Sequence, residues 1–367
     1  MPCHRRRPRT PKHRWTLGRR VPTRPVFKLS PLPRTLPAAL RDLGSKKVEV
    51  RVSAVRDLGR LAQVEPKEQA VAALEGVLLG DLSPAVRAAA AEALADAHAE
   101  ASTPALLRAL GDQHRHVQEL VLLALGEVCD SEDSRALRAV EQALDSPAPE
   151  LRFQALVALG RLRGRLSTES MLRGTRDQDP HVRYIAWRVL EEQWLEQPPP
   201  EATPESVLMR ARAALRDDAG SVRLVAAILL GRAGERAGES ILVEAVTSGR
   251  GTDEPEDDLA AVELVGDLGL GEAKPGLRRR AFGLFGWSRD RTAFQARVAL
   301  AKLGDEQAIR AILDDLGSRS RDRRSLGVAA AGQARLTQAR DLVAAMRGNE
   351  ARADQAIVAE ALERIEG

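Results

Sequence analysis

A short phrase recurs along this chain at a nearly constant spacing, and it constrains the fold more than any other feature. The clearest copies are SPAVRAAAAEAL from Ser83, PELRFQALVALG from Pro149 and GSVRLVAAILLG from Gly220. A repeat of this length is typical of chains that stack copies of one small helical unit. Such a chain grows by adding units and has no single central core, so the repeat decides the fold class before any other pattern is considered.

The valine of the Val-Arg pair, or the residue in its place, marks the start of each copy. Neighbouring landmarks lie between about 31 and 40 residues apart, the length of a helical hairpin with its turns. The landmarks are Val50, Val86, Val117, Leu151, Val182, Val222, Asp257, Thr292, Arg323 and Asp354. This spacing predicts an all-α fold, an α-solenoid of about nine to ten stacked helical hairpins.

Apolar side chains recur at helical spacing inside each copy. In the third copy they form one stripe from Val117 to Leu125, and a second apolar segment follows from Ala136 to Leu144. Asp, Ser and Pro often separate the copies, and these residues favour helix starts. Aromatic residues make up only 3% of the chain and no sustained alternation occurs, so strands are not expected.

This pattern resembles HEAT repeats, in particular the short bacterial units called HEAT-like or bilin-lyase-type repeats. The resemblance covers an array at residues 37–367, strong over about 81–250 and degenerate over about 251–367. It implies bonds between neighbouring units, made by an aspartate before the unit and the arginine of the Val-Arg pair. The residues at these positions are Asp81 with Arg87, Asp179 with Arg183, and Asp218 with Arg223. Gln118 replaces the arginine in the third unit, so we expect a break in the ladder there.

The first 36 residues differ from the array in composition. Residues 1–40 carry eleven Lys or Arg and no acid, which leaves the rest of the chain with a net charge of about −7. Residues 1–36 are also rich in proline, and this combination predicts a disordered basic tail. Three interpretations stay open: an arm that binds nucleic acid or an anionic surface, an unstructured leader, or a stretch translated from a start codon placed too far upstream.

No constellation for chemistry is recognisable. The chain has no P-loop, no Cys-x-x-Cys and no Gly-x-Ser-x-Gly, and it lacks the His-Glu pairs with which some HEAT-like hydroxylases bind iron. We therefore predict no catalytic, cofactor-binding or metal-binding residues and no enzymatic activity. Two cysteines, no apolar run of about 20 residues and no apolar stretch after the basic start predict a cytoplasmic protein without a membrane partner.

Arginines in the second helices of the units are the first candidates for binding a partner. In arrays that resemble HEAT repeats, the second helices line the concave face, and we expect that placement here. Between residues 173 and 216 these helices are predominantly basic, which suits an acidic peptide or a phosphate backbone. The candidate residues are Arg173, Arg176, Arg210, Arg212 and Arg216.

Two groups of aromatic residues interrupt the Ala- and Leu-rich pattern. One combines arginines with aromatic side chains, a composition favoured at interfaces: Arg278, Arg279, Arg280, Phe282, Phe285 and Trp287. The alternative is that the phenylalanines fill the core of a degenerate unit while the arginines are solvated. The other group is Tyr184, Trp187 and Trp194, which we interpret as core residues, with an exposed aromatic anchor as the alternative.

The functional hypothesis that follows is a non-catalytic scaffold that binds a protein partner on the concave face of the solenoid. The partner would be acidic if the arginine stripe contacts it. A first alternative is a nucleic-acid-binding protein that uses the arginine stripe and the basic tail. A second alternative is a lyase or a chaperone-like factor acting on a cofactor-bearing protein, a function for which fold alone is no evidence.

Overall fold

The computed structural model describes residues 34–64, 67–130, 132–196, 203–248, 254–283 and 290–367. Regular structure in these ranges is helical throughout, which confirms the all-α prediction. Arg34 already belongs to the array, because its side chain donates to Asp42 at 2.8 Å and to Asp57 at 2.6 Å. The array thus includes residues that the predicted tail boundary at residue 36 had excluded, while residues 1–33 lie outside the described ranges.

Ten helical hairpins follow one another in the described ranges, each an odd-numbered helix followed by an even-numbered one. The odd-numbered helices are α1 (Leu36–Asp42), α3 (Glu68–Gly80), α5 (Thr103–Ala109), α7 (Ser134–Ala143), α9 (Thr168–Gly174), α11 (Glu205–Ala214), α13 (Glu239–Thr247), α15 (Lys274–Phe282), α17 (Glu306–Leu316) and α19 (Arg340–Ala344). The even-numbered helices are α2 (Val48–Leu61), α4 (Pro84–Asp96), α6 (Arg115–Val128), α8 (Pro149–Arg163), α10 (Pro180–Glu191), α12 (Gly220–Arg232), α14 (Pro255–Asp267), α16 (Ala293–Lys302), α18 (Arg321–Gln333) and α20 (Gln355–Glu366).

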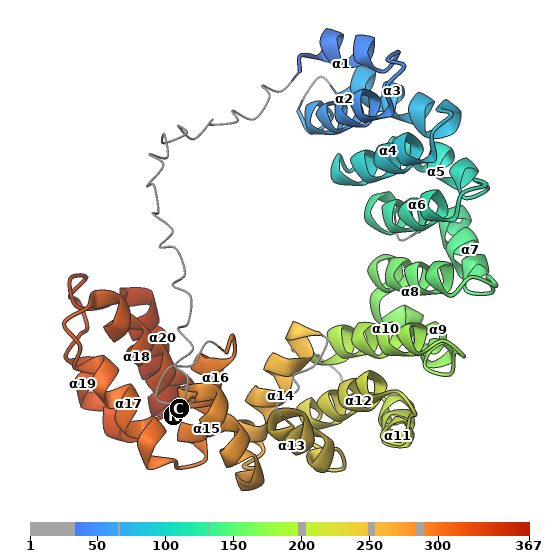
Figure 1. Cartoon of the computed structure of the whole chain (residues 1–367). Helices are drawn as coiled ribbons and strands as arrows, with labels where there is room; N and C mark the ends of the chain where they lie inside the picture. The colour runs from blue at the N-terminus through green and yellow to red at the C-terminus, as the bar shows by residue number, and fades with distance from the viewer. Residues whose placement is uncertain (1–33, 65–66, 131, 197–202, 249–253, 284–289) are drawn as a thin grey trace, which may run out of the picture.

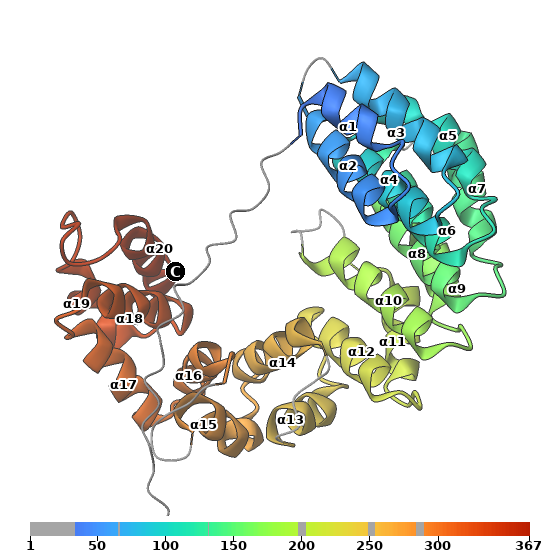
Figure 2. The same cartoon turned by 45° about the horizontal axis from the view of Figure 1, so that its top comes forward.

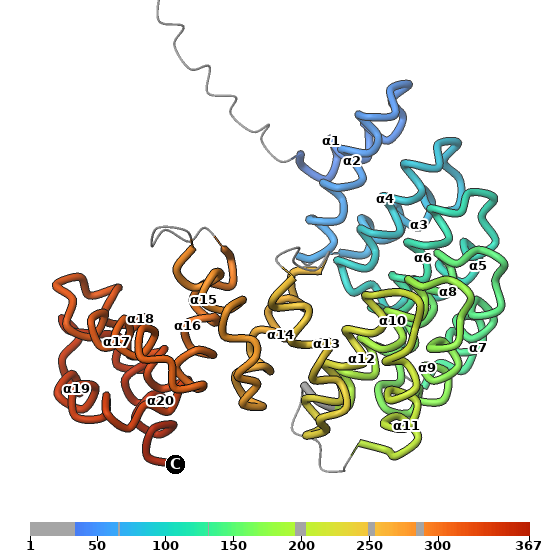
Figure 3. The backbone as a smooth tube through the Cα atoms, turned by 60° about the horizontal axis from the view of Figure 1, so that its bottom comes forward, coloured from blue at the N-terminus to red at the C-terminus, as the bar shows by residue number. Residues whose placement is uncertain are grey.

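The hairpins form an open arc, with the even-numbered helices on its inner side and the odd-numbered helices on its outer side (Figure 1). Figures 2 and 3 show the same two rows from other directions. The Val-Arg phrase therefore opens the inner helices, and the arginine-bearing helices that follow it form the outer row. Our expectation that those helices line the concave face was wrong. The spacing of a repeat does not reveal which of its two turns lies within a hairpin and which connects one hairpin to the next. It therefore does not reveal which helix of each unit faces the inner side.

Small residues allow the inner helices to approach one another closely. A Cβ atom on Gly126 of α6 would lie 2.9 Å from the Cα atom of Ala158 in α8, closer than real contacts allow. A Cβ on Gly332 of α18 would lie 2.6 Å from the Cα of Ala361 in α20. The corresponding position of α10 is Glu191, a fully buried carboxylate that pairs with arginines of α10 and α12. At this position an ion pair between α10 and α12 thus replaces the glycine contact.

The apolar interior consists of two cores that meet at α12. The first core contains buried side chains from Ala39 to Leu230, and the second contains those from Leu224 to Ile365. α12 is buried on several faces because Val225 and Leu229 pack into the first core while Leu224 and Ile228 pack into the second. Across the described ranges, no helix combines the length and apolar character required to cross a membrane.

Candidate functional site

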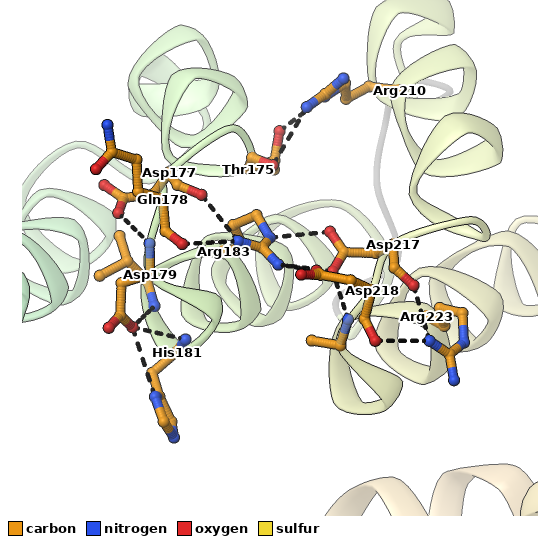
Figure 4. A network of polar contacts seen from close by, with 12 residues as sticks. Thr175, Asp177, Gln178, Asp179, His181, Arg183, Arg210, Asp217, Asp218 and Arg223 are labelled. Atoms are coloured by element: carbon orange, nitrogen blue, oxygen red, sulfur yellow. Dashed lines mark hydrogen bonds and ion pairs between the residues drawn. The ribbon is translucent and has the colours of Figure 1, made fainter.

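A ladder of ion pairs joins successive hairpins in the first half of the array. The arginine at the fourth position of an inner helix reaches an aspartate in the turn before the next inner helix. The four rungs join Arg51 to Asp81, Arg87 to Asp112, Arg152 to Asp177 and Arg183 to Asp217, each through two nitrogens at 2.6–2.9 Å. The hydrogen bond from Arg87 is the main reason why the pKa of Asp112 lies below its usual value. Figure 4 shows the last rung.

The pairs differ from those that the resemblance implied, because each arginine reaches one unit further along the chain. Arg87 donates to the backbone carbonyl of Asp81 at 2.8 Å, while its carboxylate partner is Asp112. The same carbonyl bond, to the residue six positions earlier, recurs in other inner helices, as from Arg183 to Asp177 at 3.0 Å. The predicted pair of Asp81 with Arg87 therefore contacts through the backbone, and its carboxylate pairing was wrong.

The other two predicted pairs need a similar correction (Figure 4). Asp179 is the N-cap of α10 and accepts the backbone N–H groups of residues 181 and 182, so it is not the partner of Arg183. Asp218 contacts Arg183 at 2.5 Å with its carboxylate, and its backbone carbonyl accepts from Arg223 at 3.0 Å. These residues do lie between neighbouring units, as the resemblance implied.

The ladder is interrupted at the third unit, where glutamine replaces arginine. Gln118 donates to the backbone carbonyl of Leu110 at 3.1 Å and reaches no carboxylate among the described residues. The next turn carries Ser146 where the other rungs have aspartate. Neither the arginine nor the aspartate of this rung is therefore present. The neighbouring Asp145 pairs with Arg173 of α9.

Three of the five predicted partner-binding arginines of residues 173–216 line one groove on the outer row, here called the outer groove. This groove has a volume of about 960 Å³ and lies along α9, between the turn after α7 and helix α11. It brings together Arg173, Arg176 and Arg210 beside Met209, whose side chain is 61% exposed. Arg212 and Arg216 do not line the groove.

The remaining two arginines of this group have different surroundings. Arg212 pairs with Glu205 of its own helix at 2.7 Å and also bonds to Glu235 in the turn after α12. Arg216 is exposed in the turn that follows α11. The sequence pattern therefore selected five arginines of similar spacing, and the fold separates them into a group of three and two single residues.

The second group of candidates is also divided by the fold. Arg280 is only 6% exposed and donates to Asp258 at 2.9 Å and to the carbonyl of Val246 at 3.2 Å, so it holds α15 against α13 and α14 and offers no surface to a partner. Arg278 pairs with Asp305 at 2.7 Å, and Arg279 is exposed.

The aromatic members of that group include one described residue. Phe282 is half-buried, packs against the second core and lines a smaller outer-row groove of about 570 Å³ together with Arg278 and Arg310. Phe285 and Trp287 lie outside the described residues. Of the other aromatic group, Trp187 and Trp194 are buried, as the core interpretation predicted.

A larger groove on the inner side, here called the inner groove, was not anticipated from the sequence. Its volume is about 1440 Å³, and residues of α8, α10 and α14 line it. Its apolar residues include Phe153, Ile185 and Leu166, and the Leu166 side chain is 78% exposed in the turn after α8. No sequence signal could have located this groove, because α8 and α14 are separated by about a hundred residues and two hairpins.

Buried charges support the floor of the inner groove. Arg188 of α10 contacts Glu256 at 3.0 Å and Asp257 at 3.7 Å, both at the start of α14, so it spans the position of α12. Burial raises the pKa of Asp257, and the pKa of Tyr184 beside it is raised by burial and by the Asp257 carboxylate. Tyr184 is half-buried and faces the groove, which places it apart from the two buried tryptophans.

The described ranges contain no group of three or more His, Cys, Asp or Glu residues arranged to hold a metal ion. Burial raises the pKa of the Cys129 thiol, which lies 3.4 Å from the Thr103 hydroxyl. A raised pKa disfavours the thiolate, so this cysteine has the character of a packed side chain.

Comparisons with known proteins concern the repeats. Residues 71–141 match the family model of HEAT repeats. None of the curated proteins matches the sequence. Similar solved structures include an engineered protein, with 17% identity, a TM-score of 0.41 and coverage of 90% of this chain and 98% of that one.

Two natural proteins are among the similar structures. The Escherichia coli protein YibA has 13% identity and a TM-score of 0.42, with 84% of this chain and 95% of that one covered. The complex of CpcE and CpcF of phycocyanin lyase from Nostoc sp. PCC7120 has 19% identity and a TM-score of 0.41, with 77% and 100% covered. The described ranges thus form an α-solenoid of stacked helical hairpins, and residues 71–141 of it match HEAT repeats.

Proposed function

We propose that this α-solenoid is a non-catalytic scaffold that binds a protein partner in the inner groove, on the concave side of the arc. The observation that carries the proposal is the composition of this groove. Exposed Leu166 and half-buried Phe153 and Ile185 line it together with charged residues. A surface that combines apolar side chains with charged ones is typical of protein–protein interfaces.

Charges of both signs line the inner groove, with most of its arginines on one side and most of its glutamates on another. Arg161, Arg163 and Arg165 lie on the side made by α8 and the turn after it. Glu254 and Glu256 lie on the side made by the start of α14. A nucleic-acid backbone would be repelled by the acidic side, whereas a protein segment can carry charges of both signs. This division favours a protein partner over the nucleic-acid alternative.

The cellular setting is part of the same proposal. We infer a cytoplasmic, bacterial protein from the two cysteines of the chain and from the resemblance to short bacterial repeats. Residues 1–33 would then be an accessory segment that the scaffold does not need for partner binding.

The experiment is an affinity capture from the native host, with and without nuclease, followed by titration of the captured partner with purified variants. Leu166→Asp replaces the most exposed apolar side chain of the inner groove with a charged one. Leu82→Asp is the matched control, because Leu82 is 95% exposed in the turn before α4 and lies outside the groove. We expect a discrete protein that survives nuclease, binds the wild type and Leu82→Asp equally, and binds Leu166→Asp at least about tenfold more weakly.

Two results would contradict the proposal. One is equal binding of the partner to Leu166→Asp and to the wild type, which would place the interface elsewhere. The other is capture that disappears with nuclease, or with a version of the chain that begins at Arg34. That result would favour nucleic-acid binding through the basic tail.

A further inference from the structure

The outer groove contains four arginines, and carboxylates neutralise only two of them. Arg152 donates two hydrogen bonds to Asp177 as a rung of the ladder. Arg173 pairs with Asp145 at the rim. The remaining two arginines are Arg176, in the turn after α9, and Arg210 of α11, and both line the groove. They have no carboxylate partner among the described residues.

The environment of Arg210 shows that this pair of charges is only partly compensated. Its guanidinium donates only to neutral acceptors, the hydroxyl of Thr175 at 3.1 Å and the Thr175 carbonyl at 3.2 Å (Figure 4). Burial is the main cause of a lowered pKa for Arg210, repulsion by Arg176 is the second, and attraction by the Asp217 carboxylate offsets these two effects only in part. Two like charges held near each other, one of them half-buried, constitute a site that an anion would stabilise.

The groove also offers apolar contacts next to these charges. Met209 is 61% exposed one residue before Arg210, and Leu172 is half-buried on the α9 side. Methionine adapts to differently shaped apolar side chains and is common at binding surfaces. An exposed methionine beside two partly compensated arginines fits a ligand that carries both negative charge and an apolar group.

We propose that the outer groove binds an acidic peptide segment of a partner protein. A carboxylate of the segment would lie between Arg176 and Arg210, where guanidinium groups bind carboxylates with paired hydrogen bonds. An apolar side chain next to that carboxylate would contact Met209. This surface lies on the outer row, so it is a second site that does not depend on the inner groove.

The acids of the groove favour a peptide over a nucleic acid. Asp145, Glu169 and Asp177 all line it, so negative groups alternate with the arginines along its length. A phosphate backbone carries one charge per nucleotide and would meet these carboxylates. A peptide needs only one or two acidic side chains at the position of the partly compensated pair.

The probe is a fluorescein-labelled peptide of about eight residues with alternating glutamate and leucine, titrated with the full chain and followed by fluorescence anisotropy. Arg176→Ala is the decisive variant, because Arg176 is exposed and makes no side-chain hydrogen bond with another described residue. We expect it to weaken peptide binding about tenfold, since a bond between charged groups is lost. Arg216→Ala, an exposed arginine outside the groove, is the control and should change the affinity less than about twofold.

Further arms make the test specific to this site. Met209→Asp should also weaken binding of the peptide, and the same peptide with glutamine in place of glutamate should bind about tenfold more weakly. Leu166→Asp in the inner groove should leave peptide binding unchanged, so failure of one site is distinguishable from failure of the other. Circular dichroism of each variant confirms that the solenoid is folded.

Three outcomes would overturn the proposal. The peptide does not bind the full chain, or Arg216→Ala weakens binding as much as Arg176→Ala, which would mean unspecific attraction of charge. The third is that a single-stranded DNA of about twelve nucleotides binds more tightly than the peptide and loses affinity in Arg176→Ala. That outcome would assign the groove to nucleic acid.

Discussion

The two halves of this solenoid use the same hairpin but hold successive hairpins together differently. In the first core, arginines of the inner helices form rungs with aspartates of the next turn. At the same helical position α14 carries Asp258, and its partner Arg280 comes from the following outer helix. The charge pair is inverted and lies deeper, with side chains 5% and 7% exposed. The ladder is thus an addition to the hairpin and is not required to form it.

α18 illustrates the same point with an arginine in the usual position. Arg324 donates to the carbonyl of Ser318 at 2.7 Å, as the arginines of the first core do to the residue six positions earlier. Its other nitrogens bond to the backbone carbonyls of Ala351 and Arg352 in the next turn, at 2.9 and 2.6 Å. The contact between units persists there without a carboxylate. Apolar packing therefore accounts for the stacking of the hairpins, and the ion pairs add stability to the contacts between them.

The largest effect should come from breaking the inverted pair. Arg280→Ala leaves the buried Asp258 carboxylate without its guanidinium, and removing one partner of a buried ion pair costs about 3–5 kcal/mol. Since each hairpin contacts only its neighbours, the loss should be confined to the second core. Hydrogen exchange should show α13 to α16 opening while α2 to α8 keep their protection, and Arg279→Ala, an exposed neighbour, is the control. Equal loss of protection in both cores would contradict this separation.

Breaking one rung of the ladder should cost less. Asp112→Ala removes the carboxylate partner of Arg87, whose side chain is 16% exposed, and we expect a loss of about 1–2 kcal/mol in urea unfolding. Asp218→Ala is the matched control, because the Asp218 side chain contacts Arg183 but is 89% exposed. Its loss should stay below about 0.5 kcal/mol. Equal losses in the two variants would mean that burial does not set the strength of a rung.

Restoring the missing rung should stabilise the first core. Gln118→Arg together with Ser146→Asp supplies both partners where the ladder is interrupted. We expect a gain of about 1 kcal/mol from the double variant in urea unfolding, and little from either single variant. A double-mutant cycle with a coupling energy near zero would show that α6 and α8 do not present the two side chains to each other.

The smallest effect is a difference in acid sensitivity between the halves. The pKa of Asp112 is lowered, chiefly by Arg87, so its contribution to stability is present above the unfolded pKa of about 3.9 and is lost as the pH falls through the folded pKa. The pKa of Asp257 is raised by burial, so its protonation on acidification favours the folded state. Hydrogen exchange followed as the pH falls below about 4 should show α4 losing protection earlier than α14. The reverse order would contradict these assignments.

The register of the array could be predicted because it depends on local periodicity. Eight of the ten landmarks, including the faint ones at Asp257 and Arg323, fall on the third residue of an inner helix. Thr292 and Asp354 fall on the N-cap residues of α16 and α20, so those two predictions are early by a few residues. Small residues and caps specify where a helix starts, but they do not specify which neighbour it faces.

The candidate site could be predicted only in part. Arg176 and Arg210 were selected by residue type and helical spacing, yet their meeting in one groove depends on how α11 stacks on α9. Arg280 was selected by the same criteria and is buried, because Asp258 stands in the position where other inner helices have arginine. A cluster of arginines has the same appearance in sequence whether it faces solvent or a carboxylate.

The sequence by itself determined the helices, the length of the repeat and the all-α fold class, since apolar spacing and capping residues act within a few turns of one helix. Tertiary structure alone decided which row of helices lines the concave side, which aspartate completes each rung, and where the grooves lie. Those features arise from contacts between segments that are 25 to 68 residues apart in the chain. Their geometry is fixed by the stacking of whole hairpins, and no local pattern encodes it.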